Sequence, residues 1–336
     1  MPGAIPLIRG FALLPTLHWL GEEGASVEQA LAEANLSSSP ITDPFRPIPL
    51  VHAAALLRNA AREYGPDLPC RVVSRSSSLE IAMLGKVALG TRTPAEALGR
   101  IVAALPYYCS HEQVSFERKE DQYIVREFFA HRFDPETRHL LLQYAAAMIN
   151  RILGMAVEPA PRIARIEIPP HPIHGVAHLR RWFGDSVAET RSRGITVFVN
   201  DNVMERAFDK VARDRLNPRG LCDEAPLRAG REFSDSVKSL LGLMIESDET
   251  PTMKRVIAAA GTSARTFQRQ LEVEGTSYSE LLAEVRRTET LRRLKERNVT
   301  IAAIATDLGY SDQASFTRAF RRWTGSPPGQ FRVRSN

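Results

Sequence analysis

The hydrophobic and polar positions of this chain repeat one arrangement twice near its end. The two copies are residues 253–271 and 301–320. Each starts with a short run of Ala, Ile and Val, turns at a glycine, and continues into a segment that mixes aromatic and arginine residues. Glycine permits a left-handed turn, and a serine two residues later, Ser263 or Ser311, can cap the next helix. The spacing predicts two helix-turn-helix units.

The second helix of each unit is predicted to be amphipathic. Phe316, Phe320 and Trp323 fall at helical spacing and form one apolar stripe, and Phe267 and Leu271 form the stripe of the first copy. The opposite faces carry side chains that are able to reach base edges or phosphates. These candidate DNA-binding residues are Ala264, Arg265, Gln268, Arg269, Gln313, Thr317, Arg318 and Arg321.

The segment between the copies is predicted to be one continuous helix. Residues Ser277 to Arg297 contain no proline or glycine, begin with a serine and end with basic residues. About 21 residues at a rise of roughly 1.5 Å form a rod on the order of 30 Å long, close to the ~34 Å of one DNA turn. Two recognition helices from one chain are therefore expected to enter successive major grooves.

The same stretch resembles the DNA-binding domain of the AraC/XylS family of bacterial transcription regulators. The resemblance is carried by residues Gly309 to Phe316, Arg318 to Gly325 and Ser326 to Arg332, the last of which looks like the final helix of that family. It implies a bipartite double helix-turn-helix that binds promoter DNA and contacts RNA polymerase. The sequence departs from the family pattern at Thr290, where alanine is usual, and at Gly329, which loosens the start of the last helix.

Positive charge is concentrated in the same part of the chain. The whole chain has a formal net charge of +5, and the residues from Pro251 to the end contain 15 Lys and Arg against 8 Asp and Glu. A basic excess of this kind supplies the non-specific, salt-dependent part of DNA affinity. The alternative interpretation, a solvated basic face without a partner, is common for charge runs.

The first 200 residues or so are predicted to form a mixed α and β domain. Two short helices are expected between Phe11 and Asn35, and a loop rich in Ser and Pro at 37–49. The assignment of residues 72–83 stays open. Further expected helices are Ile48–Glu63, one starting at Thr93 and Pro94, one from Asp134 to Leu153, and His178–Phe183. The expected strands are a hairpin of residues 113–119 and 122–128, and segments 162–168 and 194–199.

This order resembles the N-terminal regulatory domain of one AraC/XylS subgroup, which is arabinose-binding-like. The resemblance covers roughly Gly10 to Phe208 and implies effector sensing, dimerisation, or both. The expected fold is an α+β N-terminal regulatory domain followed by an all-α C-terminal domain with two helix-turn-helix motifs joined by a long helix. The expected domains are an effector-sensing and dimerisation domain at 1–215, a linker at 216–233, and the DNA-binding domain at 234–336.

Three histidines raise the question of a metal site. His171, His174 and His178 lie close together in sequence, and the last two are one helical turn apart. No cysteine or carboxylate accompanies them, and the neighbouring prolines indicate a surface turn. We therefore expect no metal and no cofactor.

Two other groups could belong to an effector site. The first group could line a pocket or could simply end a helix, and it consists of Tyr107, Tyr108, Cys109 and His111. The second group could pair with an acidic effector or could be ordinary surface charge, and it consists of Arg71, Arg75 and Lys86. The sequence does not identify the effector-binding residues.

An enzyme must be weighed as the second class of function. Some DNA-alkylation repair proteins combine an AraC-like reader with methyl transfer to a cysteine, and Cys109 has His111 nearby. The chain contains neither a four-cysteine zinc cluster nor a Pro-Cys-His-Arg motif, and it has no phosphate loop, GxSxG or HExxH. We therefore do not expect an enzyme. A pure protein-interaction module would not explain why arginines recur in both copies.

The remaining features set expectations for location and partners. The three cysteines are far apart and no apolar run approaches the ~20 residues of a membrane helix, so we expect a cytoplasmic protein without a membrane partner. The apolar start, Phe11 to Leu20, is read as a buried helix rather than a signal peptide. The expected partners are double-stranded promoter DNA, RNA polymerase, an unidentified small-molecule effector and a second copy of the chain in a homodimer. The expected role is that of an activator.

Overall fold

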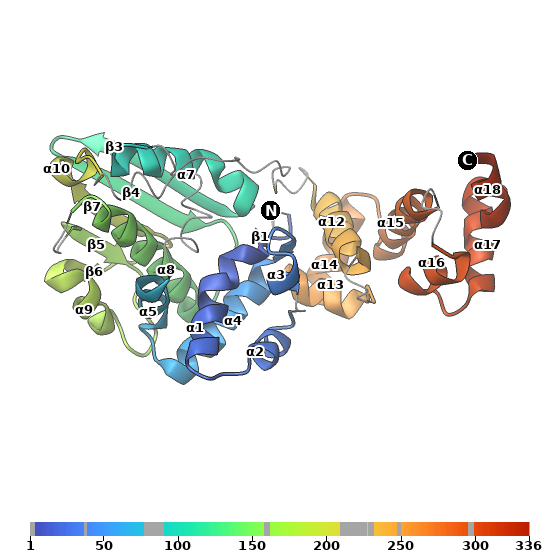
Figure 1. Ribbon diagram of the computed structural model, residues 1–336, viewed down its shortest axis with the longest axis horizontal. Helices are drawn as coiled ribbons and strands as arrows, with labels where there is room; N and C mark the ends of the chain where they lie inside the picture. Colours follow the sequence, from blue (N-terminus) through green and yellow to red (C-terminus); the bar gives the residue numbers. More distant parts are fainter. Residues whose placement is uncertain are drawn as a thin grey trace. The chain divides into compact units, whose positions relative to one another are not determined.

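A computed structural model describes residues 4–36, 39–76, 91–157, 162–208, 227, 232–246, 250–294 and 299–335. The chain divides into two compact units, one formed by Pro6–Arg228 and the other by Ala229–Asn336 together with Met1–Ile5 (Figure 1). No helix among the described residues is long and apolar enough to cross a bilayer.

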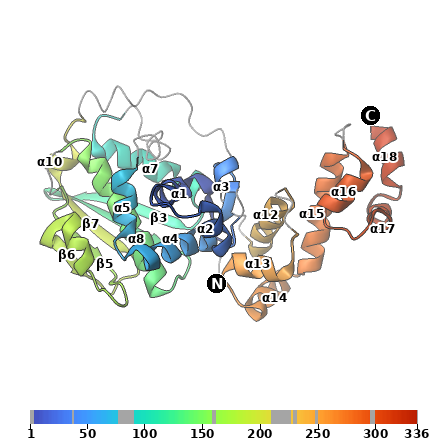
Figure 2. The same ribbon diagram turned by 60° about the horizontal axis from the view of Figure 1, so that its bottom comes forward.

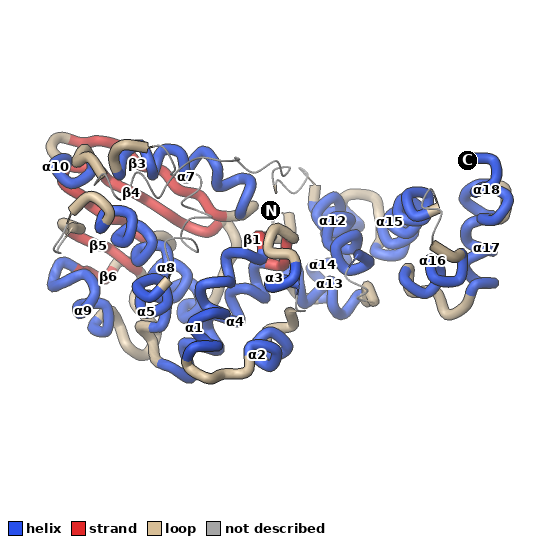
Figure 3. The backbone as a smooth tube through the Cα atoms, in the orientation of Figure 1, coloured by secondary structure: helices blue, strands red, loops and turns tan. Residues whose placement is uncertain are grey.

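The first unit is built on a five-stranded sheet with the strand order β3-β4-β7-β5-β6 (Figure 3). Neighbouring strands are antiparallel except β5 and β6, which are parallel. The strands are β3 (Glu112–Lys119), β4 (Gln122–Phe129), β5 (Arg165–Ile168), β6 (Val187–Glu189) and β7 (Ile195–Asn200). The predicted hairpin is confirmed as β3 and β4, and Glu120 adopts a left-handed conformation at its turn.

Helix α8 (Pro135–Gly154) covers this sheet and packs against β4, β5 and β7. Its start was predicted correctly: the Asp134 carboxylate accepts a hydrogen bond of 3.0 Å from the Thr137 backbone N–H. Apolar side chains of the helix and the sheet form one buried core, in which Leu142, Ala146, Val197 and Ile166 are at most 1 % exposed.

Shorter elements surround α8 and the sheet. Helices α4 and α5 pack on α8, and α7 packs on β3. The helices are η1 (Gly10–Leu13), α1 (Leu14–Glu22), α2 (Val27–Glu33), α3 (Ser39–Thr42), α4 (Leu50–Tyr64), α5 (Leu68–Arg75), α7 (Pro94–Tyr108), η2 (Ala177–Leu179), α9 (Arg180–Phe183), η3 (Gly184–Ser186) and α10 (Asp201–Met204). A small antiparallel sheet of β1 (Leu7–Arg9) and β2 (Pro47–Pro49) completes the unit.

Most of the predicted helices and strands of this unit are present, and the misses have a physical cause. The expected loop at 37–49 contains α3 and β2, and the next helix begins at Leu50 rather than Ile48. Proline is tolerated in β2 because this strand pairs on one side only, with β1. Helix α5 ends at Arg75, and residues 77–83 of the open segment lie outside the described residues.

The second unit is helical throughout its described elements (Figure 2). Its helices are α12 (Phe233–Glu246), α13 (Met253–Ala260), α14 (Ala264–Val273), α15 (Tyr278–Arg293), α16 (Ile301–Asp307), α17 (Gln313–Thr324) and α18 (Pro328–Ser335). The pairs α13–α14 and α16–α17 correspond to the two sequence copies, and α15 joins them. The helix predicted at Ser234–Ile245 is α12, longer by one residue at each end.

Candidate nucleic-acid interface

The first helix pair turns where the sequence indicated. Gly261 ends α13 in a left-handed conformation with φ of 61°. Ser263 then caps α14, and its hydroxyl oxygen accepts a hydrogen bond of 3.2 Å from the Thr266 backbone N–H. Thr252 caps α13 in the same way. These contacts fix the entry and exit of the turn, and so set the angle between the two helices.

Helix α14 has a buried face and an exposed face. Phe267 and Leu271 are 0 % and 1 % exposed, and Phe267 meets the ring of Phe233 edge-on at 5.4 Å between centroids. The predicted apolar stripe is therefore confirmed. The exposed residues of this helix include all four candidates from the sequence, Ala264, Arg265, Gln268 and Arg269.

The end of α14 is tied to the start of α12 by one carboxylate. Glu274 accepts hydrogen bonds from the backbone N–H groups of Phe233 (2.7 Å) and Ser234 (2.8 Å). These bonds hold the pKa of Glu274 below its usual range, against the effect of its partial burial. The carboxylate thus satisfies two free N–H groups at a helix N-terminus and interacts favourably with the helix dipole.

The second pair follows the same design with one correction. Ser311 was expected to cap α17, but the N-cap is Asp312, which accepts a hydrogen bond of 2.7 Å from the Ser315 backbone N–H. Bonds from the Ser315 backbone, from its hydroxyl and from the Ser311 hydroxyl lower the pKa of Asp312 to about 2. The serine supports the cap instead of forming it, because a carboxylate one residue later accepts more bonds.

Helix α17 also separates its two faces. Phe316 and Phe320 are 0 % exposed, and Trp323 is half-buried beside them. Among the candidates, Gln313, Arg318 and Arg321 are exposed and Thr317 is half-buried.

Two of these candidates make hydrogen bonds within the helix itself. The Thr317 hydroxyl donates to the Gln313 carbonyl (2.8 Å), and the Arg318 guanidinium donates to the Ser315 hydroxyl (2.8 Å). The hydroxyl of Thr317 is thus already occupied, whereas the guanidinium of Arg318 has further N–H groups available for a ligand.

Helix α15 is shorter than predicted but anchors the second pair firmly. It spans 16 residues, a length of about 24 Å. Ser277 caps its start as expected, and residues 295–297 of the predicted helix lie outside the described residues. At its far end, Arg293 binds Asp307 of α16 at 2.7 Å and Glu289 at 2.6 Å.

Arg286 of α15 was missed by sequence reasoning. Its guanidinium lies 4.8 Å from the centroid of the Tyr310 ring and donates a hydrogen bond of 3.1 Å to the Gly309 carbonyl. Gly309 has a φ of 72°, and a Cβ there would lie 3.1 Å from the Arg286 Nη2 atom. The left-handed backbone of the turn therefore favours glycine at this position, and a Cβ would crowd the guanidinium. The sequence shows that Arg286 lies in the predicted linker helix, but not that it faces the turn.

The two departures from the family pattern are accommodated. Thr290 is fully buried, and its hydroxyl donates to the Arg286 carbonyl at 2.6 Å, so its polar group is satisfied inside the helix. Gly329 lies in the first turn of α18, directly after Pro328. Its position beside Ile301 leaves ordinary contact distance for a Cβ.

The remaining sequence candidates do not form one site. Arg71 pairs with Asp67 at 3.2 Å and Arg75 pairs with Glu23, so both charges are compensated within the first unit. Both lie on helix α5. Tyr107 is exposed, whereas Tyr108 and Cys109 are buried where α7 ends. Lys86 lies outside the described residues.

The two cysteines that the structure describes lack the environment of a nucleophile. Cys70 and Cys109 are free and buried, and burial raises the pKa of each thiol, which favours the unreactive protonated form. Cys222 lies outside the described residues.

The first unit contains one hollow of interest. It has a volume of about 620 Å³ and lies beside helices α1 and α5. Its lining includes buried Leu17, Trp19 and Val72, together with the polar His18 and Arg75. The indole N–H of Trp19 is buried and has no hydrogen-bond partner among the described residues.

Comparison with known families gives the context for these two units. Residues 24–199, more than half of the chain, match the arabinose-binding domain found at the N-terminus of AraC transcription regulators. The chain belongs to the AraC family of transcription regulators. Residues 256–334 match a helix-turn-helix domain, and this segment spans both helix pairs of the AraC-type reader described above.

Individual relatives of this AraC family member match a short stretch of it. An ornithine utilization regulator of Pseudomonas aeruginosa is 33 % identical over 90 residues, which are 27 % of this chain and 26 % of the relative. The HTH-type transcriptional regulator VirS of Mycobacterium tuberculosis is 40 % identical over 69 residues, or 20 % of each chain. The chain thus matches only about a quarter or less of the length of these relatives. The crystal structure of the transcriptional regulator CdpR from Pseudomonas aeruginosa aligns over 96 % of this chain and 98 % of that chain, with 18 % identity and a TM-score of 0.42.

Proposed function

We propose that the protein is a sequence-specific DNA-binding transcription regulator that acts as an activator under the control of a small-molecule effector. The observation that carries this proposal is the design shared by α14 and α17. Each helix buries an apolar stripe and exposes arginine and glutamine side chains on its other face. Such side chains donate to guanine and adenine edges in the major groove and to phosphates.

The helix between the pairs would set their spacing on DNA. Helix α15, at about 24 Å, together with the segments that link it to the two helix pairs, would present α14 and α17 to successive major grooves, which recur every ~34 Å. The contacts of Arg286 and Arg293 would keep the second pair fixed to this spacer. A fixed spacing favours specificity, because a mismatched site then loses one of the two contacts.

The eight candidate residues would make different kinds of contact with DNA, according to the chemistry of their side chains. Arg269 and Arg318 would read bases, because each is exposed on its reading helix. Ala264 would allow close approach of the backbone at the start of α14. The Thr317 hydroxyl is occupied within its helix, so we assign it a methyl contact with DNA instead of a hydrogen bond. Arg265, Gln268, Gln313 and Arg321 would complete the base and phosphate contacts.

The first unit would supply regulation. The proposal includes the expected effector-sensing and dimerisation domain at 1–215 and the expected DNA-binding domain at 234–336. It also includes a homodimer and contact with RNA polymerase. The hollow beside Trp19 is the candidate effector site, since buried apolar side chains line it together with the polar His18 and Arg75. Quenching or enhancement of Trp19 fluorescence by a compound, absent in Trp19→Phe, would identify a ligand.

The direct test is a fluorescence-anisotropy titration of the full-length protein. DNA from upstream of its own gene and its neighbouring genes is compared with random DNA at two salt concentrations. The proposal predicts tighter binding to one upstream fragment and an affinity that falls steeply with salt. Equal binding to all fragments would contradict sequence-specific recognition, and no binding at either salt concentration would contradict DNA binding itself.

A further inference from the structure

Four histidines from two distant parts of the sequence gather on one side of the first unit. His139 lies on α8, while His171, His174 and His178 belong to the segment between β5 and β6. The ring centroids of His139 and His178 are 5.1 Å apart, and those of His139 and His171 are 5.4 Å apart. The sequence shows only three of these residues together, because the fourth comes from a helix that precedes them by more than 30 residues.

The two innermost rings point nitrogen atoms at each other. The Nε2 atoms of His139 and His178 are 3.0 Å apart. The Nδ1 atom of His139 lies 2.7 Å from the Pro169 carbonyl oxygen, which can only accept, so this Nδ1 carries the proton. Neutral His139 therefore directs the lone pair of its Nε2 towards His178.

In either neutral tautomer, one nitrogen of His178 then lacks a suitable partner. If its Nε2 carries the proton, the hydrogen bond to His139 is satisfied but Nδ1 is a buried acceptor with no donor among the described residues. If its Nδ1 carries the proton, two lone pairs face each other at 3.0 Å. A cation between the two Nε2 atoms removes this conflict, because both lone pairs then serve as ligands.

The observed spacing fits two ligands of one transition-metal ion. Bonds of ~2.0–2.1 Å in tetrahedral geometry place two ligating nitrogens roughly 3.3 Å apart and their ring centroids roughly 5.2 Å apart. The His139–His178 pair needs only a few tenths of an ångström of adjustment to reach these values. The bond from His139 Nδ1 to a backbone carbonyl is also the usual way in which a metal-binding histidine is oriented.

The surrounding chain holds the cluster in place and leaves it accessible. His171 and Gly175 exchange two backbone hydrogen bonds, of 3.0 and 2.9 Å, which close a tight turn. The Nδ1 of His171 accepts from the backbone N–H groups of Ile173 and His174 at 3.2 Å each, so this ring supports the turn and is not a ligand. His174 is exposed and His178 is half-buried, which provides an entry path.

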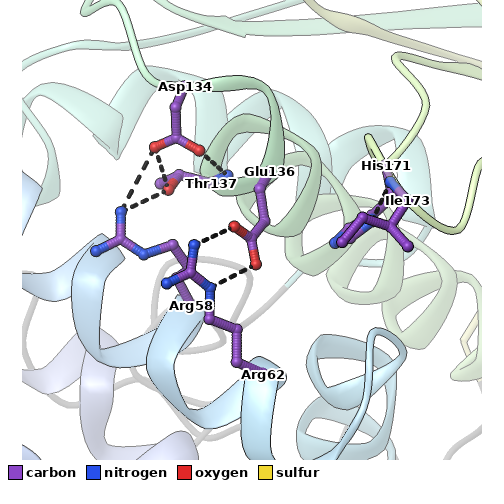
Figure 4. Close-up of polar contacts among 7 residues, drawn as sticks. All are labelled: Arg58, Arg62, Asp134, Glu136, Thr137, His171 and Ile173. Carbon is purple, nitrogen blue, oxygen red and sulfur yellow. Dashed lines mark hydrogen bonds and ion pairs between the residues drawn. The ribbon is translucent and has the colours of Figure 1, made fainter.

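Two carboxylates lie near the cluster, and both are paired with arginines. Asp67 lies near His178 and is paired with Arg71 at 3.2 Å and with Arg181 at 3.4 Å. Glu136 lies near His171 and is held by two hydrogen bonds to Arg62, of 2.9 and 2.6 Å (Figure 4).

We propose that His139 and His178 form the preformed half of a binding site for a divalent transition-metal ion such as Zn²⁺, Co²⁺ or Ni²⁺, with His174 as the third ligand. Among the described residues, no group of three or more His, Cys, Asp or Glu side chains is placed to hold a metal ion as it stands. The ring of His174, whose centroid is 6.3 Å from that of His178, must therefore turn inward by about 1 Å to reach the ~5.2 Å of a shared tetrahedral ion. Ligation by imidazole alone excludes Ca²⁺ and Mg²⁺, which require oxygen ligands.

The test uses the full-length protein after chelation and dialysis. Titration with Co²⁺ is followed by visible absorption, and Zn²⁺ is then added in competition. The expected result is one equivalent of Co²⁺ with a tetrahedral spectrum that Zn²⁺ abolishes. His139→Gln and His178→Gln are each expected to weaken binding tenfold or more, and His174→Gln to change the spectrum.

A matched control keeps the result interpretable. His131 is half-buried and meets Phe133 edge-on outside the cluster, so His131→Gln should bind Co²⁺ as the unaltered protein does. Circular dichroism checks folding, and the half-buried His178 provides a milder variant should His139→Gln fail to fold. Absence of Co²⁺ and Zn²⁺ binding at concentrations on the order of 100 μM, or full binding by His178→Gln, would overturn the proposal. Neither readout depends on DNA.

Discussion

The guanidinium of Arg286 lies 4.8 Å from the centroid of the Tyr310 ring and thereby fixes the second helix pair to the helix that precedes it. The same side chain donates to the carbonyl of Gly309, the glycine of the turn. One arginine therefore couples the spacer α15 to the geometry of the turn between α16 and α17. A DNA-binding unit composed of two helix pairs needs this kind of coupling, since each pair by itself is small.

Loss of this contact should loosen the second pair selectively. Arg286→Ala removes a cation–π contact and a charged hydrogen bond, together worth about 1–3 kcal/mol at a half-buried site. Hydrogen exchange of the full-length protein should show protection in α16 and α17 reduced by roughly tenfold, because 1.4 kcal/mol corresponds to a factor of ten. Protection in α13 and α14 should be unchanged. A uniform loss across both pairs would contradict the anchoring role.

The aromatic stripe of α17 makes a larger contribution to stability. Phe320 is fully buried and meets Phe331 edge-on at 5.5 Å, so Phe320→Ala should destabilise this half of the unit by roughly 3–5 kcal/mol. Local hydrogen exchange again measures the effect. Val273→Ala, at a position that is 76 % exposed in the same unit, is the matched control and should change protection very little. Comparable losses in both variants would contradict the assignment of the core.

Much of this unit was predictable from the sequence because its signals are local. These signals are a glycine at a turn, a cap two or three residues later and an aromatic residue at every fourth position. Each can be recognised from a few neighbouring residues. The contacts of Arg286 and the cap by Asp312 depend on how helices meet and on which of two adjacent polar residues accepts more bonds. Periodicity contains no information about either of these.

The first unit was predicted less completely for the same reason. Its long helix α8 and the β3–β4 hairpin have strong local patterns, and both were recognised. The strand pairings β4–β7 and β5–β6 join residues far apart in sequence, and the short β6 has too few residues to show alternation. The histidine cluster is a similar case, because His139 reaches the other three only through the packing of α8.

The N-cap of α17 makes the stability of this helix depend on pH in the acid range. The pKa of Asp312 is about 2 in the folded protein, below the ~3.9 of an unfolded chain, so its contribution is present above pH 4 and is lost as the pH falls from about 4 to 2. Hydrogen exchange or circular dichroism between pH 5 and 2 should show α17 weakening over this range. Asp312→Asn should flatten that part of the profile, and an unchanged profile would contradict the cap's role.

The thiol of Cys109 provides a discriminating test of the enzyme alternative. Because the residue is 3 % exposed and burial raises its pKa, iodoacetamide should leave Cys109 unmodified in the native protein at pH 7–8 and should modify it after denaturation. Peptide mass spectrometry locates the label. Rapid native alkylation at Cys109 would indicate an activated thiolate and would revive the alkyl-transfer alternative.

The reading faces themselves are tested by substitution of one arginine on each. Arg269→Ala and Arg318→Ala should each weaken specific binding by about 1–3 kcal/mol, if each side chain contacts a base. Arg287 is exposed on α15 and provides the control. Arg287→Ala should cost little affinity and mainly alter the dependence on salt. Equal losses in all three variants would contradict the division into reading and non-reading faces.

The central claim, that one chain reads two major grooves, is tested most directly by footprinting the full-length protein and these two variants on its operator. The account predicts two protected major-groove segments about one helical turn apart, with Arg269→Ala losing protection in one segment and Arg318→Ala losing it in the other. A single protected segment, or loss of the same segment in both variants, would contradict it.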